Sequence, residues 1–126
     1  MSIRDLKPQL IWEQFDDICQ VPRPSKKEGK IIAWLQEWAK KHNFDYQTDE
    51  TGNVVIRKAA TKSFEGRPAV ILQSHMDMVC EKNSDVEFDF ENDPIQPWID
   101  GEWVKAKGTT LGADCGIGMA AALAVL

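Results

Sequence analysis

The feature that most constrains the fold is a short apolar run at residues 69–72, followed directly by a polar segment that contains His75 and Asp77. A run of this length, made of Ala, Val, Ile and Leu, is typical of a strand that is covered on both faces. Side chains alternate across a strand, so residues two positions apart point to the same side. We therefore expect His75 and Asp77 to face the same way at the end of a buried strand.

Amphipathic segments before this strand predict helices. Residues 7–19 carry apolar side chains at helical spacing, and so do residues 28–41. Ser25 and Glu28 have the Ser-x-x-Glu spacing of a capping box, which favours a helix start at the second segment.

Two further segments, residues 44–57 and 95–106, each have the pattern of two short strands joined by a turn. A glycine-bearing loop from residue 112 opens a last helix. The sequence predicts an α/β fold with helices packed on a mixed sheet, and residues 1–126 are expected to belong to one domain.

A second polar position lies in the glycine-rich segment 108–118, where Asp114 stands in a loop that leads into the last helix. Zinc in hydrolases is held by His and carboxylate side chains, and the two oxygens of one carboxylate can bridge two ions. A lone His at a strand end is usually an ordinary polar residue, so the case for a metal site depends on His75, Asp77 and Asp114 together. The glycines do not form Gly-x-Gly-x-x-Gly, so a dinucleotide site is not expected.

These segments resemble the dinuclear zinc exopeptidases of the aminoacylase and carboxypeptidase clan, and within it the Xaa-His dipeptidases. The chain departs from that family at Cys115, where Asn is usual, and at residues 88–90, where the family often has His-Asp-Phe. The blocks that carry the resemblance at family spacing are His75-x-Asp77, Pro22-Arg23-Pro24-Ser25-Lys26-Lys27-Glu28, Asp93-Pro94-Ile95, Asp100-Gly101-Glu102-Trp103-Val104 and residues 108–118.

The resemblance implies a role for each candidate residue. His75 would be a terminal ligand of one zinc ion, and Asp114 would bridge two. Asp77 would be the catalytic-site carboxylate that orients His75 by accepting its other ring N–H. The resemblance further implies two Zn²⁺ ions in a complete site, with Mn²⁺ or Co²⁺ as alternatives, and a cis peptide bond between Asp114 and Cys115. The activity implied is hydrolysis of Xaa-His dipeptides by a metal-activated water, in a protein that forms a homodimer through a domain absent from this chain.

Bulk properties exclude several other classes of protein. The net charge is -5 and no basic run stands out, so nucleic acid is not an expected partner. Three cysteines without close pairing indicate a reducing compartment. The N-terminus has no signal-peptide pattern, and the longest apolar run, residues 119–126, is far too short to cross a membrane. We therefore predict a cytoplasmic protein with no membrane partner.

The end of the chain predicts that it is the front part of a longer catalytic domain. It stops at Leu126 inside a helical pattern without a stop signal. The adjacent Glu-Glu pair that supplies the general base and a ligand in the family does not occur here. We expect the segment alone to be catalytically inert and to bind zinc weakly. Two alternatives stay open: a related metal-dependent deacylase of the same clan, or an inert fragment that acts as an interaction module through exposed apolar residues.

Overall fold

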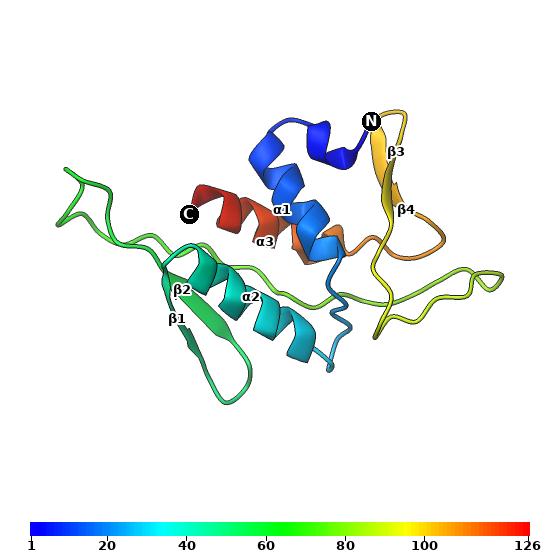
Figure 1. Ribbon diagram of the computed structural model, residues 1–126, viewed down its shortest axis with the longest axis horizontal. Coiled ribbons are helices and arrows are strands. Elements are labelled where there is room, and N and C mark those ends of the chain that lie inside the picture. The colour runs from blue at the N-terminus through cyan, green and yellow to red at the C-terminus, as the bar shows by residue number, and fades with distance from the viewer.

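The computed structural model describes all residues, 1–126, and confirms the α/β class (Figure 1). None of its helices has the length and apolar composition that crossing a bilayer requires. Along the chain the elements are η1 (Ile3–Asp5), α1 (Gln9–Cys19), α2 (Gly29–Lys41), β1 (Asp45–Thr48), β2 (Val54–Arg57), β3 (Pro97–Asp100), β4 (Trp103–Ala106) and α3 (Ala113–Val125).

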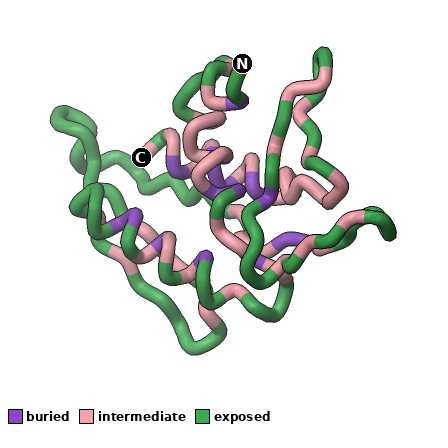
Figure 2. The backbone as a smooth tube through the Cα atoms, turned by 45° about the vertical axis from the view of Figure 1, so that its right-hand side comes forward, coloured by how far each residue is buried: buried purple, intermediate pink, exposed green.

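Helices α1 and α3 pack against each other and form the centre of the core (Figure 1). Phe15 and Ile18 repeat at helical spacing on α1 and are buried, and they belong to the same apolar cluster as Met119 and Leu123 of α3. Buried residues lie along these two helices and along α2 (Figure 2). This packing places the beginning of α3, and with it Asp114, close to the end of α1.

Helix α2 lies along the first hairpin, in which β1 and β2 are antiparallel. The turn between the two strands is held by Asp49, whose carboxylate accepts hydrogen bonds from the backbone N–H groups of Thr51, Gly52 and Asn53. The second hairpin, β3 and β4, is also antiparallel. Both hairpins confirm the sequence prediction, because short strands with a turn between them are specified locally.

The strand predicted at residues 69–72 is absent, and so is the mixed sheet. The sheets are two separate antiparallel pairs, and residues 69–72 take part in no backbone hydrogen bond. Val70 and Ile71 are 83% and 88% exposed. A strand needs a neighbour to pair its backbone groups, and no other segment of this chain forms backbone hydrogen bonds with residues 69–72. This part of the prediction is therefore wrong: the segment is extended and uncovered.

The capping box predicted before α2 is also absent. Helix α2 has no side-chain cap, and Glu28 accepts instead from the backbone N–H of Lys26 at 2.7 Å. Residues 23–25 form a parallel bridge with Met78: the Met78 N–H donates to the Arg23 carbonyl at 3.0 Å, and the Ser25 N–H donates to the Met78 carbonyl at 3.2 Å. The connection between α1 and α2 therefore anchors the segment that carries His75 and Asp77.

Candidate metal centre

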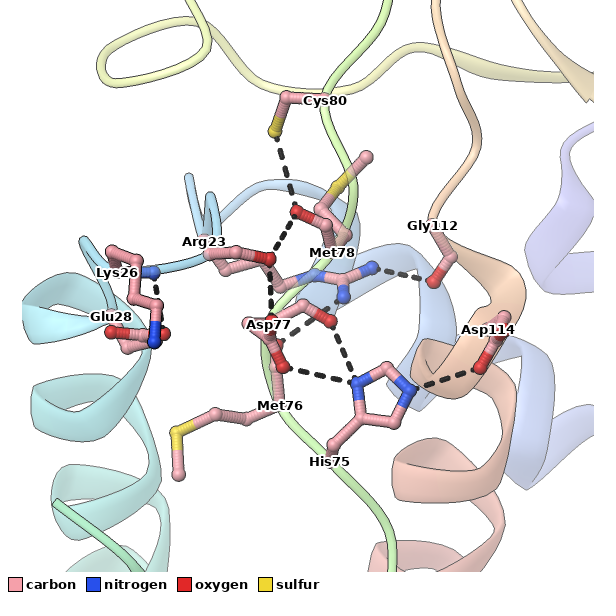
Figure 3. A network of polar contacts seen from close by, with 11 residues as sticks. Arg23, Lys26, Glu28, His75, Met76, Asp77, Met78, Cys80, Gly112 and Asp114 are labelled. Carbon is pink, nitrogen blue, oxygen red and sulfur yellow. Dashed lines mark hydrogen bonds and ion pairs between the residues drawn. The ribbon is translucent and has the colours of Figure 1, made fainter. Parts of the chain in front are cut away.

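His75 and Asp114 meet directly although 39 positions separate them in the sequence. The His75 Nε2 atom lies 2.9 Å from Asp114 Oδ1. His75 comes from the extended segment before Met78, and Asp114 comes from the beginning of α3 (Figure 3). The two residues predicted as metal ligands are thus brought together by the fold.

Asp77 lies on the opposite side of the His75 ring (Figure 3). The Nδ1 atom of His75 is 3.1 Å from the Asp77 carboxylate and 3.0 Å from its carbonyl oxygen. Both are acceptors, so Nδ1–H donates to Asp77, and Nε2 can contact the Asp114 carboxylate only through a proton that it donates or through a bound metal ion that replaces this proton. The position of Asp77 agrees with the orienting role that the resemblance implies.

A third side chain, Ser25, holds Asp77 in turn. Its hydroxyl oxygen lies 2.5 Å from Asp77 Oδ2 and 3.2 Å from the Met78 carbonyl. A hydroxyl has a single proton, and the short contact with the charged oxygen is the stronger one. Ser25, Asp77, His75 and Asp114 therefore form a continuous chain of polar contacts that ends in the solvent.

The charges along this series of polar contacts favour a cation at the His75 ring. The hydrogen bond to Asp114 raises the pKa of His75 above its ordinary value, with further contributions from Asp77 that partial burial opposes. The hydrogen bond from Ser25 lowers the pKa of Asp77, and the contact with His75 acts in the same direction. Negative charge on both sides of the imidazole attracts positive charge to it, so a proton and a metal ion compete for the same place at Nε2.

The donor set fits a metal ion. The ligand atoms of His75, Asp114 and Cys115 all lie within 4.8 Å of one another, and two ligands of one tetrahedral zinc are about 3.4 Å apart. The Asp114 side chain is 97% exposed, and only one of its oxygens is engaged by the chain. The other oxygen has no hydrogen-bond partner in the chain.

The backbone at the start of α3 presents Asp114 outside the regular helix. Gly112 has φ 73° and ψ 25°, in the left-handed region, and Asp114 and Cys115 have non-helical angles. The Asp114–Cys115 peptide bond is cis, which confirms the prediction drawn from the resemblance.

Comparison with known proteins finds similarity to peptidases. The chain is 54% identical over 125 residues to the cytosol non-specific dipeptidase of Escherichia coli (strain K12), a match that covers 99% of this chain and 26% of the relative. The crystal structure of an aminoacylhistidine dipeptidase from Vibrio alginolyticus matches with a TM-score of 0.96 at 54% identity, again over 99% of this chain and 26% of that one.

The chain is similar to dipeptidases over nearly its whole length. It spans about a quarter of the length of these relatives. A tripeptidase from Staphylococcus aureus shares the fold, with a TM-score of 0.74 at 24% identity over 95% of this chain and 31% of that one. No family model matches the chain. The α/β fold and the resemblance to Xaa-His dipeptidases that the sequence motifs indicated are thus supported by whole-chain similarity.

Two residues of the centre were not predicted from the sequence. Ser25 was assigned to a helix cap, yet it contacts Asp77. Arg23 is 1% exposed and donates to backbone carbonyls on both ligand-bearing segments, at Met76 (3.3 Å) and Gly112 (2.8 Å). Backbone carbonyls carry no residue-type signal, so only the flanking prolines of Arg23 marked it as unusual.

Two of the three cysteines lie in contrasting places, Cys19 in the core and Cys115 in the candidate metal centre. Cys19 is buried, and desolvation raises its pKa to about 12, which leaves an unreactive thiol. Cys115 lies beside the ligand atoms of His75 and Asp114. All three cysteines are free thiols.

Proposed function

We propose that this chain forms part of a metal-dependent dipeptidase, in which His75 and Asp114 hold Zn²⁺ and Asp77 orients His75. The observation that carries the proposal is the 2.9 Å contact between His75 Nε2 and Asp114, with Asp77 on the other ring nitrogen. The similarity to the E. coli dipeptidase supports the same activity.

Bound zinc would act as a Lewis acid and make hydroxide available near neutral pH. The residues of the chain would hold and orient the proposed ligands at this end of the site. Asp77 keeps the imidazole proton on Nδ1, so Nε2 stays available as a ligand. Ser25 keeps Asp77 in its ionised form and in one orientation. Asp114 offers one oxygen on the side of His75 and the other to a second ion, for which Zn²⁺, Mn²⁺ and Co²⁺ are candidates.

The proposed substrate class is dipeptides, with Xaa-His dipeptides included. The Vibrio relative is an aminoacylhistidine dipeptidase, whereas the E. coli relative is described as non-specific. The chain contains no adjacent Glu-Glu pair, so the general base would come from outside it and the segment alone would be inactive. We further propose a cytoplasmic location, in line with the cytosolic E. coli relative, and a homodimer formed outside this segment.

The test is the peptidase activity of the full-length gene product on an Xaa-His dipeptide, before and after chelation and zinc add-back. Activity is expected to disappear with the chelator, return with zinc, and be lost in His75→Ala and Asp114→Ala. His42→Ala is the matched control, because His42 stacks on Trp38 with ring centroids 4.0 Å apart and contacts neither proposed ligand. Activity that ignores the chelator and both substitutions would contradict the proposal, and preferential cleavage of N-acyl amino acids would indicate a deacylase.

A second candidate function is an interaction module, favoured by the uncovered apolar segment at residues 69–72. Val70 and Ile71 are almost fully exposed, and exposed apolar patches commonly mark association sites. Light scattering on the isolated chain tests this candidate, with Ile71→Lys as the variant that removes the patch. Association that Ile71→Lys abolishes supports the module, and a monomer at all concentrations contradicts it.

A further inference from the structure

Arg23 is a buried cation without an anionic partner. It is 1% exposed and is the largest of the fully buried side chains, and it takes part in no ion pair. Its Nε atom is buried with no hydrogen-bond partner. Burial of a charge is costly unless hydrogen bonds replace the lost water. A role beyond filling the core would account for a charged group at this buried position.

The two carbonyls that Arg23 contacts identify that role. Met76 lies between His75 and Asp77, and its carbonyl accepts from Nη1 at 3.3 Å. Gly112 lies just before Asp114, and its carbonyl accepts from Nη2 at 2.8 Å. A guanidinium is a rigid planar fork whose donors have fixed spacing. One side chain therefore fixes the distance between the two segments that supply the proposed ligands (Figure 3).

The glycines at the start of α3 show how tightly the guanidinium is fitted. A Cβ atom on Gly112 would lie 2.6 Å from Arg23 Nη2, and one on Gly116 would lie 2.7 Å from the same atom. A larger residue at either position would therefore require the guanidinium to shift. The main chain of Arg23 adds a further link, since its carbonyl accepts from the Met78 N–H at 3.0 Å.

We propose that Arg23 is a positioning residue of the metal centre, and that it sets the separation between His75 and Asp114. The inference rests on the proposed function of that centre. A residue that only filled the core would alter stability and leave metal affinity unchanged in the folded protein. Arg23→Lys separates the two roles, because it keeps the charge, yet an ammonium group is a compact point donor that cannot match the fork.

The experiment uses the full-length gene product and measures zinc affinity by competition with a chromophoric chelator, well below the unfolding temperature. Arg23→Lys is expected to weaken zinc binding about 10- to 100-fold, the range for residues that support metal ligands. Amide hydrogen exchange of the metal-free protein is expected to speed up at residues 74–78 and 110–114 together. The matched control is Arg4→Lys, since Arg4 pairs with Asp16 and Asp17 at 3.1 and 2.6 Å, and neither contacts a proposed ligand. It should lower the melting temperature and leave zinc affinity and exchange at these segments unchanged.

Gly116→Ala provides a second variant in case Arg23→Lys fails to fold. It leaves Arg23 in the sequence, but its Cβ would lie 2.7 Å from Arg23 Nη2 and 3.0 Å from Phe15 Cε2. The guanidinium would have to shift, so zinc affinity is again expected to fall. A folded Arg23→Lys or Gly116→Ala protein with the zinc affinity of the wild type overturns the inference and leaves the proposed function intact. A wild type that binds no zinc overturns the proposed function, and the inference that rests on it.

Discussion

Ser25→Ala offers the most direct test of how the centre is organised, because it removes one hydroxyl and nothing else. The Ser25 hydroxyl donates to Asp77 over 2.5 Å, and Asp77 orients the proposed ligand His75 over 3.1 Å. Without the hydroxyl, the Asp77 carboxylate gains rotational freedom and its pKa rises toward the ordinary value. The imidazole then spends less time in the orientation that directs Nε2 toward Asp114.

The structure bounds the size of this effect. A hydrogen bond to a charged group contributes about 1.5–3 kcal/mol. The Asp77 side chain is 33% exposed, so water replaces part of the lost interaction, and about 1–1.5 kcal/mol is a reasonable share. Each 1.4 kcal/mol corresponds to a factor of ten. Zinc affinity of the full-length gene product should therefore fall about 5- to 12-fold.

The measurement is a competition titration with a chromophoric zinc chelator at neutral pH. Ser25→Thr retains the hydroxyl and should stay closer to the wild type than Ser25→Ala does. Ser84→Ala changes an exposed serine whose side chain makes no hydrogen bond within the chain, and it should have no effect. A zinc affinity in Ser25→Ala within twofold of the wild type would refute the idea that Ser25 supports His75 through Asp77.

Four further outcomes are expected. Zinc affinity should fall as the pH is lowered through the raised pKa of His75, because protonation of Nε2 excludes the metal. A zinc affinity that does not change between pH 5 and pH 8, about 1.5 pH units either side of the ordinary histidine pKa, would contradict this. In metal-free protein the stabilising effect of protonated His75 runs the other way: it is fully present below the ordinary histidine pKa and is lost as the pH rises through the raised value. Asp114→Asn should lower the pKa of His75, which NMR titration of the ring protons can detect. Phe15→Ala should lower the free energy of unfolding by about 3–5 kcal/mol because Phe15 is fully buried, whereas Leu10→Ala on the exposed side of the same helix should change the urea midpoint little.

Local elements of the fold were predictable from the sequence, and elements that depend on distant partners were not. Helices α1 and α2 follow from apolar periodicity, and both hairpins follow from turn residues between short strands. The apolar run at residues 69–72 indicated burial, yet a sequence pattern does not say which segment supplies the cover. No segment of this chain pairs with residues 69–72, so their backbone groups form no hydrogen bonds with other backbone groups.

The candidate site shows the same division. The proximity of His75, Asp77 and Asp114 was predictable, because their residue types and spacing suit a metal and match a family pattern; their role as ligands stays a prediction. Ser25 was misassigned because Ser-x-x-Glu is a local signal, whereas its actual partner, Asp77, is 52 positions away. Arg23 was missed because buried arginines are rare and its partners are main-chain oxygens, which any residue can provide.

The fit of the Arg23 guanidinium against Gly112 and Gly116 has an evolutionary consequence. A side chain at position 116 is incompatible with the arginine as placed, and loss of the arginine leaves a space that a side chain could fill. Substitutions at positions 23 and 116 should therefore be epistatic, so that changes deleterious one at a time become more tolerable in combination. Among relatives, arginine at position 23 should occur together with glycine at 116, whereas the left-handed backbone at position 112 favours glycine whichever residue stands at 23.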